Sequence, residues 1–166
     1  VRVKFCEAYI ERAHRTLADI GLAPKLYFCA QVRGRVNMVI MEFVEGRDAH
    51  HQFNGEELPP GVMRDVKLAV EELHRLGLVF GDLRRSNIMI CRFGRDVDRL
   101  DWAGDDRQAQ YPALLNDPGE ISWADGVAPA AAARMKKRHD LDMIEKLHRR
   151  RSVSQVQSAN SQLNSC

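Results

Sequence analysis

Apolar side chains recur every three or four residues between Pro60 and Leu76, and this is the spacing of a helix with one buried face. Pro60 suits the first helical turn, and Gly77 suits the position just after the last one. A helix with a single apolar face is stable only when other elements cover that face. The segment therefore predicts a helix that packs against other elements of a folded domain. The elements before and after it indicate the fold class.

The chain before this helix is predicted to contain mostly β-strand. Residues 1–5 alternate in polarity, and two β-rich runs, KLYFCAQV and VNMVIMEFV, flank a turn at Gly34, which predicts a hairpin. Between residues 1–5 and the hairpin, the spacing of apolar residues predicts a helix over Ile10–Ile20, ended by Gly21. Residues 45–61 are polar and broken by glycine and proline, so we expect a loop with one short helix.

The chain after this helix is predicted to continue with a second hairpin, NIMIC and VDRLDW, around Gly94. A further helix is expected over Pro129–His148, because proline suits a first helical position. Residues 149–166 are rich in serine, glutamine and asparagine and poor in apolar residues, so we expect them to be disordered. This order of strands and helices predicts an α+β fold and not a doubly wound sheet.

Composition sets limits on the class of protein. The 166 residues suffice for one domain, and 45% hydrophobic with 29% charged residues is typical of a globular protein. No apolar run reaches eighteen residues and the start does not resemble a signal peptide, so we expect a cytoplasmic protein without a membrane partner. The net charge of +2 gives no reason to expect nucleic acid, and the basic cluster Arg134–His139 is interpreted as a solvated helix surface. The four scattered cysteines predict reduced thiols and no zinc site.

The stretch LVFGDLRRSNIMI carries the candidate chemistry. Asp82 and Asn87 lie five residues apart between two apolar runs. Phosphoryl transfer needs a carboxylate near the acceptor, oxygen ligands for a metal, and cations on the phosphates. Asp82 can orient or deprotonate an acceptor hydroxyl, Asn87 can supply an oxygen to Mg²⁺, and Arg84 can contact the transferred phosphate. The same pair alone is also common in turns, but a preceding long helix and a following strand favour the catalytic interpretation.

A family resemblance follows from these residues. LHRLGLVFGDLRRSNIMI, followed by LDWAG, resembles the catalytic and metal-binding segments of the protein-kinase-like superfamily. The GDL…N form is similar to that of aminoglycoside and choline phosphotransferases. It is most similar to kinase-like proteins of fungi, in which a YP pair, a later tryptophan and an HD helix also occur. Here these are Tyr111–Pro112, Trp123 and His139–Asp140.

The resemblance implies a domain organisation. It predicts a protein-kinase-like fold over residues 1–148, with a partial β-rich N-terminal lobe at 1–44, a mainly helical C-terminal lobe at 45–148, and the tail at 149–166. In that arrangement Val1 already lies in the strand that follows the glycine-rich loop over the phosphates. We therefore expect an N-terminally incomplete domain.

The resemblance also assigns nucleotide-binding residues. Lys4 is placed on the strand that holds the ATP phosphates, and Glu11 of the following helix is expected to pair with it, with Glu7 as the alternative. The segment MEFVEG resembles the hinge whose backbone binds adenine, so Glu42 and Val44 are expected there. Phe80 occupies a position where the family has His or Phe, and this position serves packing.

The metal site has two candidate arrangements. Asn87 is expected to bind Mg²⁺ together with Asp101 of LDWAG, and Asp98 is the alternative. In the fungal pattern the first aspartate of this segment binds the metal, and here Arg99 stands at that position. Asp98 and Asp101 lie on opposite faces of a strand, so only one of them easily faces inward.

Two functions remain open at this point. The first is an ATP- and Mg²⁺-dependent phosphotransferase that acts on an unidentified hydroxyl acceptor. The second is a catalytically inactive kinase-like domain that binds a protein partner, which Arg99 and the absence of a GxGxxG motif favour.

Overall fold

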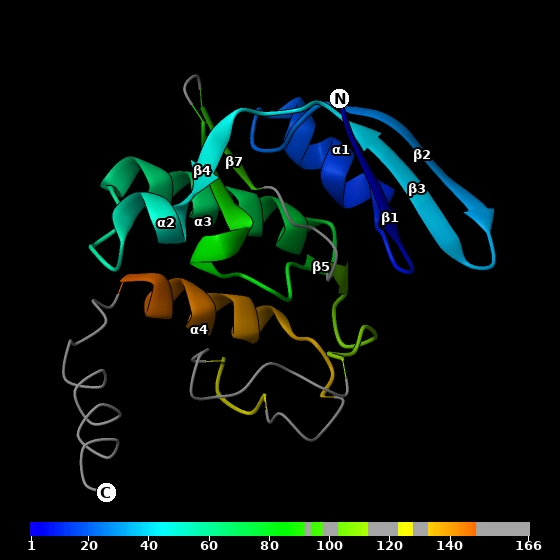
Figure 1. Ribbon diagram of the computed structural model, residues 1–166. Coiled ribbons are helices and arrows are strands. Elements are labelled where there is room, and N and C mark those ends of the chain that lie inside the picture. The colour runs from blue at the N-terminus through cyan, green and yellow to red at the C-terminus, as the bar shows by residue number, and fades with distance from the viewer. Residues whose placement is uncertain (92–93, 98–102, 113–122, 128–132, 149–166) are drawn as a thin grey trace, which may run out of the picture.

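The computed structural model describes residues 1–91, 94–97, 103–112, 123–127 and 133–148 (Figure 1). The predictions for Asp98, Asp101 and the tail 149–166 lie outside these residues. The elements in chain order are β1 (Arg2–Cys6), α1 (Glu11–Asp19), β2 (Leu26–Arg33), β3 (Val36–Met41), β4 (Gly46–Asp48), α2 (Ala49–Phe53), α3 (Pro60–Arg75), β5 (Leu78–Val79), the 3₁₀ turn η1 (Arg85–Asn87), β6 (Ile88–Cys91), β7 (Gly94–Val97), β8 (Gly104–Asp105) and α4 (Lys137–His148).

The described residues form an α+β structure, as the sequence predicts. The N-terminal antiparallel sheet has the order β1-β3-β2, and α1 packs between this sheet and α3 (Figure 1). A second antiparallel sheet has the order β4-β6-β7, and β5 pairs with β8. Helix α3 lies at the centre of the remaining elements, with α4 on the opposite side of the loop that follows β5 (Figure 1). None of the described helices is both long and apolar enough to cross a membrane.

The predicted N-terminal hairpin is confirmed. Strands β2 and β3 pair in antiparallel register from Leu26↔Met41 to Arg33↔Val36. Gly34 and Arg35 connect them with φ of 56° and 68°. Two successive positive φ angles give a turn whose twist matches that of paired strands, and glycine adopts this conformation without strain.

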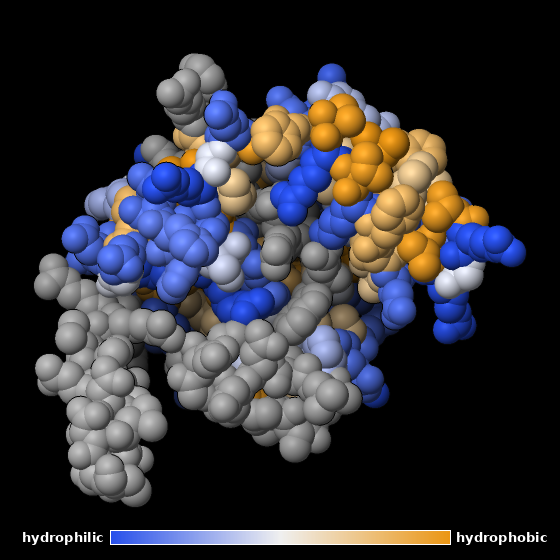
Figure 2. Space-filling view, viewed as in Figure 1, coloured by the Kyte–Doolittle hydropathy of each residue, from blue (hydrophilic) through white to orange (hydrophobic). Residues whose placement is uncertain are grey.

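Strand β1 has its apolar residues on the outer face of the sheet. Val1, Val3 and Phe5 are exposed by 81%, 50% and 63%, while Lys4 and Cys6 on the other face are half-buried. Figure 2 shows hydrophobic residues gathered over this N-terminal sheet. The alternation predicted for residues 1–5 is therefore present, and the polar face of the strand is the covered one.

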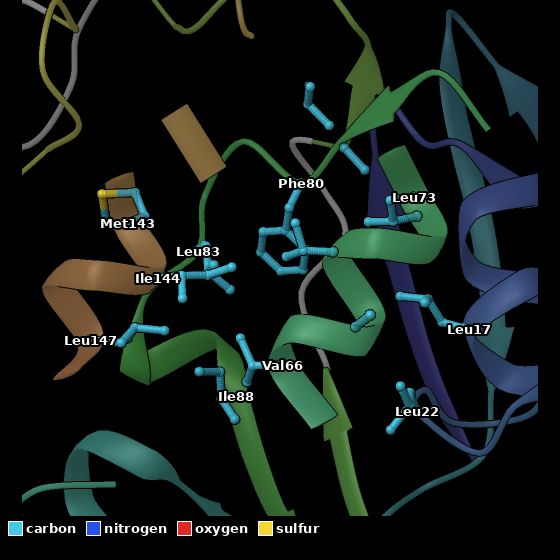
Figure 3. Packing of buried hydrophobic residues seen from close by; sticks show 14 of the residues in the cluster. Leu17, Leu22, Val66, Leu73, Phe80, Leu83, Ile88, Met143, Ile144 and Leu147 are labelled. Carbon is cyan, nitrogen blue, oxygen red and sulfur yellow. The ribbon is translucent and has the colours of Figure 1, made fainter. Parts of the chain in front are cut away.

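The predicted central helix is also confirmed, since α3 runs from Pro60 to Arg75 with Leu76 as its C-cap and Gly77 at φ 74°. Its buried face meets the loop after β5 and the helix α4. Figure 3 shows Phe80 beside Leu73 and Val66, with Met143 of α4 on the far side of the loop. These residues belong to one hydrophobic core.

Two element boundaries differ from the sequence prediction. The helix expected from Pro129 begins only at Lys137, because residues 133–135 form hydrogen bonds with residues 107–111 instead of helical ones. The amide of Tyr111 donates to the carbonyl of Ala133 (3.0 Å), and that of Met135 donates to Ala109 (2.8 Å). In the second hairpin, Gly94 pairs with Cys91 and so lies within β7 instead of in the turn.

Candidate functional site

The candidate site is the buried loop that joins β5 to β6. Phe80, Gly81, Asp82 and Leu83 are all buried, and η1 ends the loop at Asn87. Gly81 has φ of 82°, a backbone conformation that residues with a Cβ rarely adopt. A glycine here lets the chain turn sharply one residue before Asp82, which explains the glycine of the GD pair.

Asp140 of α4 holds the backbone of this loop. Its carboxylate is 1% exposed and accepts hydrogen bonds from the amides of Phe80 (2.8 Å) and Gly81 (3.0 Å). His74 Nε2 lies 2.9 Å from Asp140 Oδ2. Hydrogen bonds to a buried carboxylate are stronger than those between neutral groups, so the loop is fixed directly before Asp82. The HD pair is visible in the sequence, but this positioning role is not predicted from it. The available signal was a carboxylate in the first turn of an amphipathic helix.

Asp82 forms a bidentate ion pair with Arg84. The guanidinium donates to both carboxylate oxygens, with Arg84 Nη2 2.7 Å from Asp82 Oδ2 and Nε bound to Oδ1. The guanidinium carbon of Arg84 lies 5.4 Å from the ring centroid of Trp123, at cation–π distance. The two charges are largely withdrawn from solvent, and each neutralises the other.

Asn87 closes the loop from the other end. Its side-chain amide donates to the carbonyl of Asp82 (2.7 Å), and this bond joins two residues that are five positions apart in the loop. The residue is fully buried, and among the described residues its Oδ1 atom has no hydrogen-bond partner. A buried amide oxygen without a partner costs free energy unless a ligand satisfies it. This oxygen has the chemistry that Mg²⁺ prefers, so Asn87 fits the predicted metal role.

The second metal residue stays a prediction. Strand β8 pairs with β5 through Val79↔Gly104, so the segment that follows LDW runs beside the entry to the loop. Ala103 in this segment is buried, but Asp98 and Asp101 lie outside the described residues. Within the described ranges, no group of three or more His, Cys, Asp or Glu side chains is arranged to hold a metal.

Tyr111 and His139 are buried side by side, next to Trp123, the residue that contacts Arg84 of the ion pair. The Tyr111 hydroxyl lies 3.3 Å from His139 Nδ1, and the Tyr111 ring packs edge-on against Trp123. Burial, together with the negative charges of Asp140 and Asp82, raises the pKa of Tyr111. Burial, then Arg138 and Lys136, lower the pKa of His139. Both side chains are therefore neutral near pH 7 and add no charge to the loop.

The predicted phosphate-anchoring residues lie on the N-terminal sheet and its helix. Lys4 is half-buried on β1, with its ammonium 5.5 Å from the ring centroid of Tyr9. Glu11 opens α1 and binds Arg15 one turn later, with Arg15 Nε 2.7 Å from Glu11 Oε1. Glu7 is exposed. The pairing of Lys4 with either glutamate stays a prediction.

The predicted hinge is the segment between β3 and β4. The Glu42 amide donates to the carbonyl of Lys25 (2.8 Å), and the Glu42 carboxylate accepts from the Lys25 amide (3.2 Å). Within the described part of the chain, residues 43–45 form no hydrogen bond to other backbone groups. The binding of adenine by the backbone at Glu42 and Val44 stays a prediction.

The structure thus brings together three of the predicted site residues, Asp82, Arg84 and Asn87, on one rigid loop. It places Lys4, Glu11, Glu42 and Val44 on the N-terminal sheet, on its helix and on the segment that leaves it. Among models of protein families, none matches the sequence.

Proposed function

We propose that this chain carries the catalytic loop of an ATP- and Mg²⁺-dependent phosphotransferase with a protein-kinase-like fold. The observation that supports this most directly is the buried, unpartnered Oδ1 of Asn87 on the same loop as Asp82. If Asn87 served only to form a turn, both the oxygen and the NH₂ of its side-chain amide would have hydrogen-bond partners in the loop or in solvent. An oxygen left without a partner, five residues from a buried carboxylate, is the donor that a metal–phosphate complex needs.

The proposed reaction follows from the positions of Asp82 and Arg84. The acceptor hydroxyl oxygen forms a bond to the γ-phosphorus of ATP, and the bond from that phosphorus to the bridging oxygen breaks, releasing ADP. Asp82 orients the hydroxyl and takes its proton. Arg84 is bound to Asp82 and can share its guanidinium with the equatorial oxygens of the transferred phosphoryl group.

The remaining groups would position the nucleotide. Mg²⁺, when bound, supplies positive charge to the β- and γ-phosphates. Asn87 and Asp101 would hold it, with Asp98 as the alternative to Asp101. Lys4 would contact the phosphates with Glu11 as its partner, and the backbone at Glu42 and Val44 would bind adenine. In this proposal residues 1–44 act as a partial N-terminal lobe and residues 45–148 as the C-terminal lobe.

A second function is favoured by one specific contact. Arg84 occupies both oxygens of Asp82, and this pairing stabilises the carboxylate without leaving an oxygen fully free for a substrate proton. Together with Arg99 at the usual metal position, this contact suits a domain that binds nucleotide or a protein partner without turnover.

Turnover of ATP separates the two functions. In the proposed enzyme, ADP release by the full chain with Mg²⁺–ATP is measurable with water or small alcohols as acceptors. Asp82→Asn lowers it by about a hundredfold or more, as expected when a general base is removed. Glu72→Gln is the matched control, because the Glu72 carboxylate also accepts from the Nε and Nη2 atoms of an arginine, Arg75, but this arginine is largely exposed.

Two outcomes would contradict a catalytic role of Asp82. If the parent chain binds Mg²⁺–ATP but releases ADP no faster than Asp82→Asn does, the domain is a binding module. If Glu72→Gln loses as much turnover as Asp82→Asn, the effect is a general charge effect and the catalytic role of Asp82 is wrong.

A further inference from the structure

A cavity of about 510 Å³ lies between the segment after β8 and the start of α4. The described residues that line it include one acidic residue among basic ones: Asp106, Arg107, Arg134, Lys136, Lys137 and Arg138. From the sequence, the basic cluster Arg134–His139 is predicted to be a solvated helix surface. In the structure, four residues of this cluster instead line a cavity, together with Arg107 from a distant part of the chain.

The walls of the cavity are held by backbone hydrogen bonds. The amide of Arg107 donates to the carbonyl of Met135 (2.8 Å), and the Arg134 guanidinium donates to the carbonyl of Arg107 (3.0 Å). Arg107 has φ of 61°, a conformation that side-chain-bearing residues rarely adopt. Such backbone strain persists only where the surroundings enforce it, and it is frequent at ligand-binding sites. The basic side chains are therefore attached to a prearranged scaffold.

Among the described residues, acidic side chains balance only part of the positive charge of the cavity. Asp106 accepts from the Lys137 amide (3.2 Å) and lies 3.7 Å from the Arg107 guanidinium. Lys136 and Arg138 have no ion-pair or hydrogen-bond partner among the described residues. Lys137 and Arg138 also occupy the first turn of α4, the positive end of a helix dipole, where cations are unfavourable and anions are stabilised.

We propose that this cavity binds a small polyanion that carries at least two phosphate groups. Five basic side chains and one acidic side chain line it, so a single phosphate would leave most of the charge unpaired. Its volume falls within the usual range of small-molecule sites, about 300–1,000 Å³. The arginines offer paired donors that match phosphate oxygens. Nucleic acid is disfavoured, because none of the described residues that line the cavity is an aromatic residue that could stack on a base.

The site is connected to the catalytic loop through Lys137. The Lys137 ammonium donates to the carbonyl of His74 (2.6 Å), and His74 in turn binds Asp140, which holds Phe80 and Gly81. A polyanion that binds at the start of α4 therefore stabilises the helix that positions the loop. Binding is expected to raise the melting temperature of the full chain.

Titration calorimetry of the full chain with sodium tripolyphosphate, without Mg²⁺ and at constant ionic strength, tests the proposal. Saturable binding to one site is expected, and the double variant Lys136→Gln/Arg138→Gln is expected to bind at least tenfold more weakly. The matched control Arg33→Gln/Lys67→Gln removes the same charges from exposed positions on β2 and α3, and is expected to change the affinity less than twofold. Circular dichroism verifies that each variant folds. If the double variant Lys136→Gln/Arg138→Gln does not fold, the single variant Arg138→Gln is used in its place.

A further variant separates this site from the proposed nucleotide site. Lys4→Gln is expected to leave tripolyphosphate binding unchanged. The proposal is overturned if the parent shows no saturable binding, if both double variants lose affinity equally, or if Lys4→Gln abolishes binding. It is also overturned if a single-stranded oligonucleotide of equal charge binds more tightly than tripolyphosphate, because the surface is then a nucleic-acid site.

Discussion

The N-terminal sheet and the region around α3 carry the two halves of the proposed site, and they are stabilised very differently. The buried core of the sheet consists of Leu26, Val39 and Met41, and its outer face exposes apolar side chains. The region around α3 shares one large core with α1, α4 and the loop. Asp82 and Asn87 therefore lie on a rigid base, whereas Lys4 lies on an element with little buried surface. We therefore expect the arrangement of Asp82 and Asn87 to persist under mild denaturing conditions. A nucleotide contact through Lys4 is expected to be lost earlier, because the N-terminal sheet unfolds more easily.

The largest expected effect comes from Asp140. Asp140→Ala leaves the buried amides of Phe80 and Gly81 without their charged acceptor, so we expect the free energy of unfolding to fall by about 3–5 kcal/mol. Urea unfolding measures this change. Asp142→Ala, on the same helix, is the matched control and is expected to change stability by less than about 0.5 kcal/mol. Equal losses in the two variants would show that Asp140 does not hold the loop.

The next effect compares the two cores directly. Leu73 and Val39 are both fully buried, one in each core. Leu73→Ala is expected to cost about 3 kcal/mol in global unfolding. Val39→Ala is expected to cost about 1.5 kcal/mol. Hydrogen exchange is expected to show Val39→Ala opening β2 and β3 while α3 stays protected. If both variants accelerate exchange throughout the chain, the two regions unfold as one unit and the contrast is wrong.

The smallest expected effect concerns pH. Burial, followed by Arg138 and Lys136, holds the pKa of His139 below its ordinary value of 6.5. Near pH 6.5 the unfolded chain therefore binds a proton that the folded chain does not. The stability from neutral His139 is present above this pH and is lost as the pH falls below it.

Urea midpoints at about pH 7.5 and about pH 5.5 measure this loss. The difference is expected to shrink in His139→Gln and to persist in His148→Gln, since His148 is exposed. A His139→Gln variant with the full pH dependence of the parent would contradict this explanation.

The sequence predicted the elements that depend on local patterns. Helix α3 ends within one residue of the prediction because its apolar spacing is regular, and the hairpin at Gly34 follows from turn chemistry. The start of α4 was predicted too early, because residues 133–135 pair with the distant residues 107–111. The contact of Asp140 with Phe80 spans sixty residues of chain, and no local pattern reveals it. The Arg84–Asp82 pair was likewise not predicted, since either partner was free to face a substrate.

Calorimetric titration of the full chain with ATP, with and without Mg²⁺, is the most direct test of the claim that the Asp82–Asn87 loop is a metal–phosphate site. The unpartnered Asn87 Oδ1 predicts that Mg²⁺ strengthens ATP binding by the parent. In Asn87→Leu, which loses one of the two proposed metal ligands, the strengthening of ATP binding by Mg²⁺ is expected to be much smaller, while circular dichroism shows an intact fold. A parent chain that binds ATP equally well with and without Mg²⁺, or an Asn87→Leu variant that retains the full Mg²⁺ effect, would contradict the account.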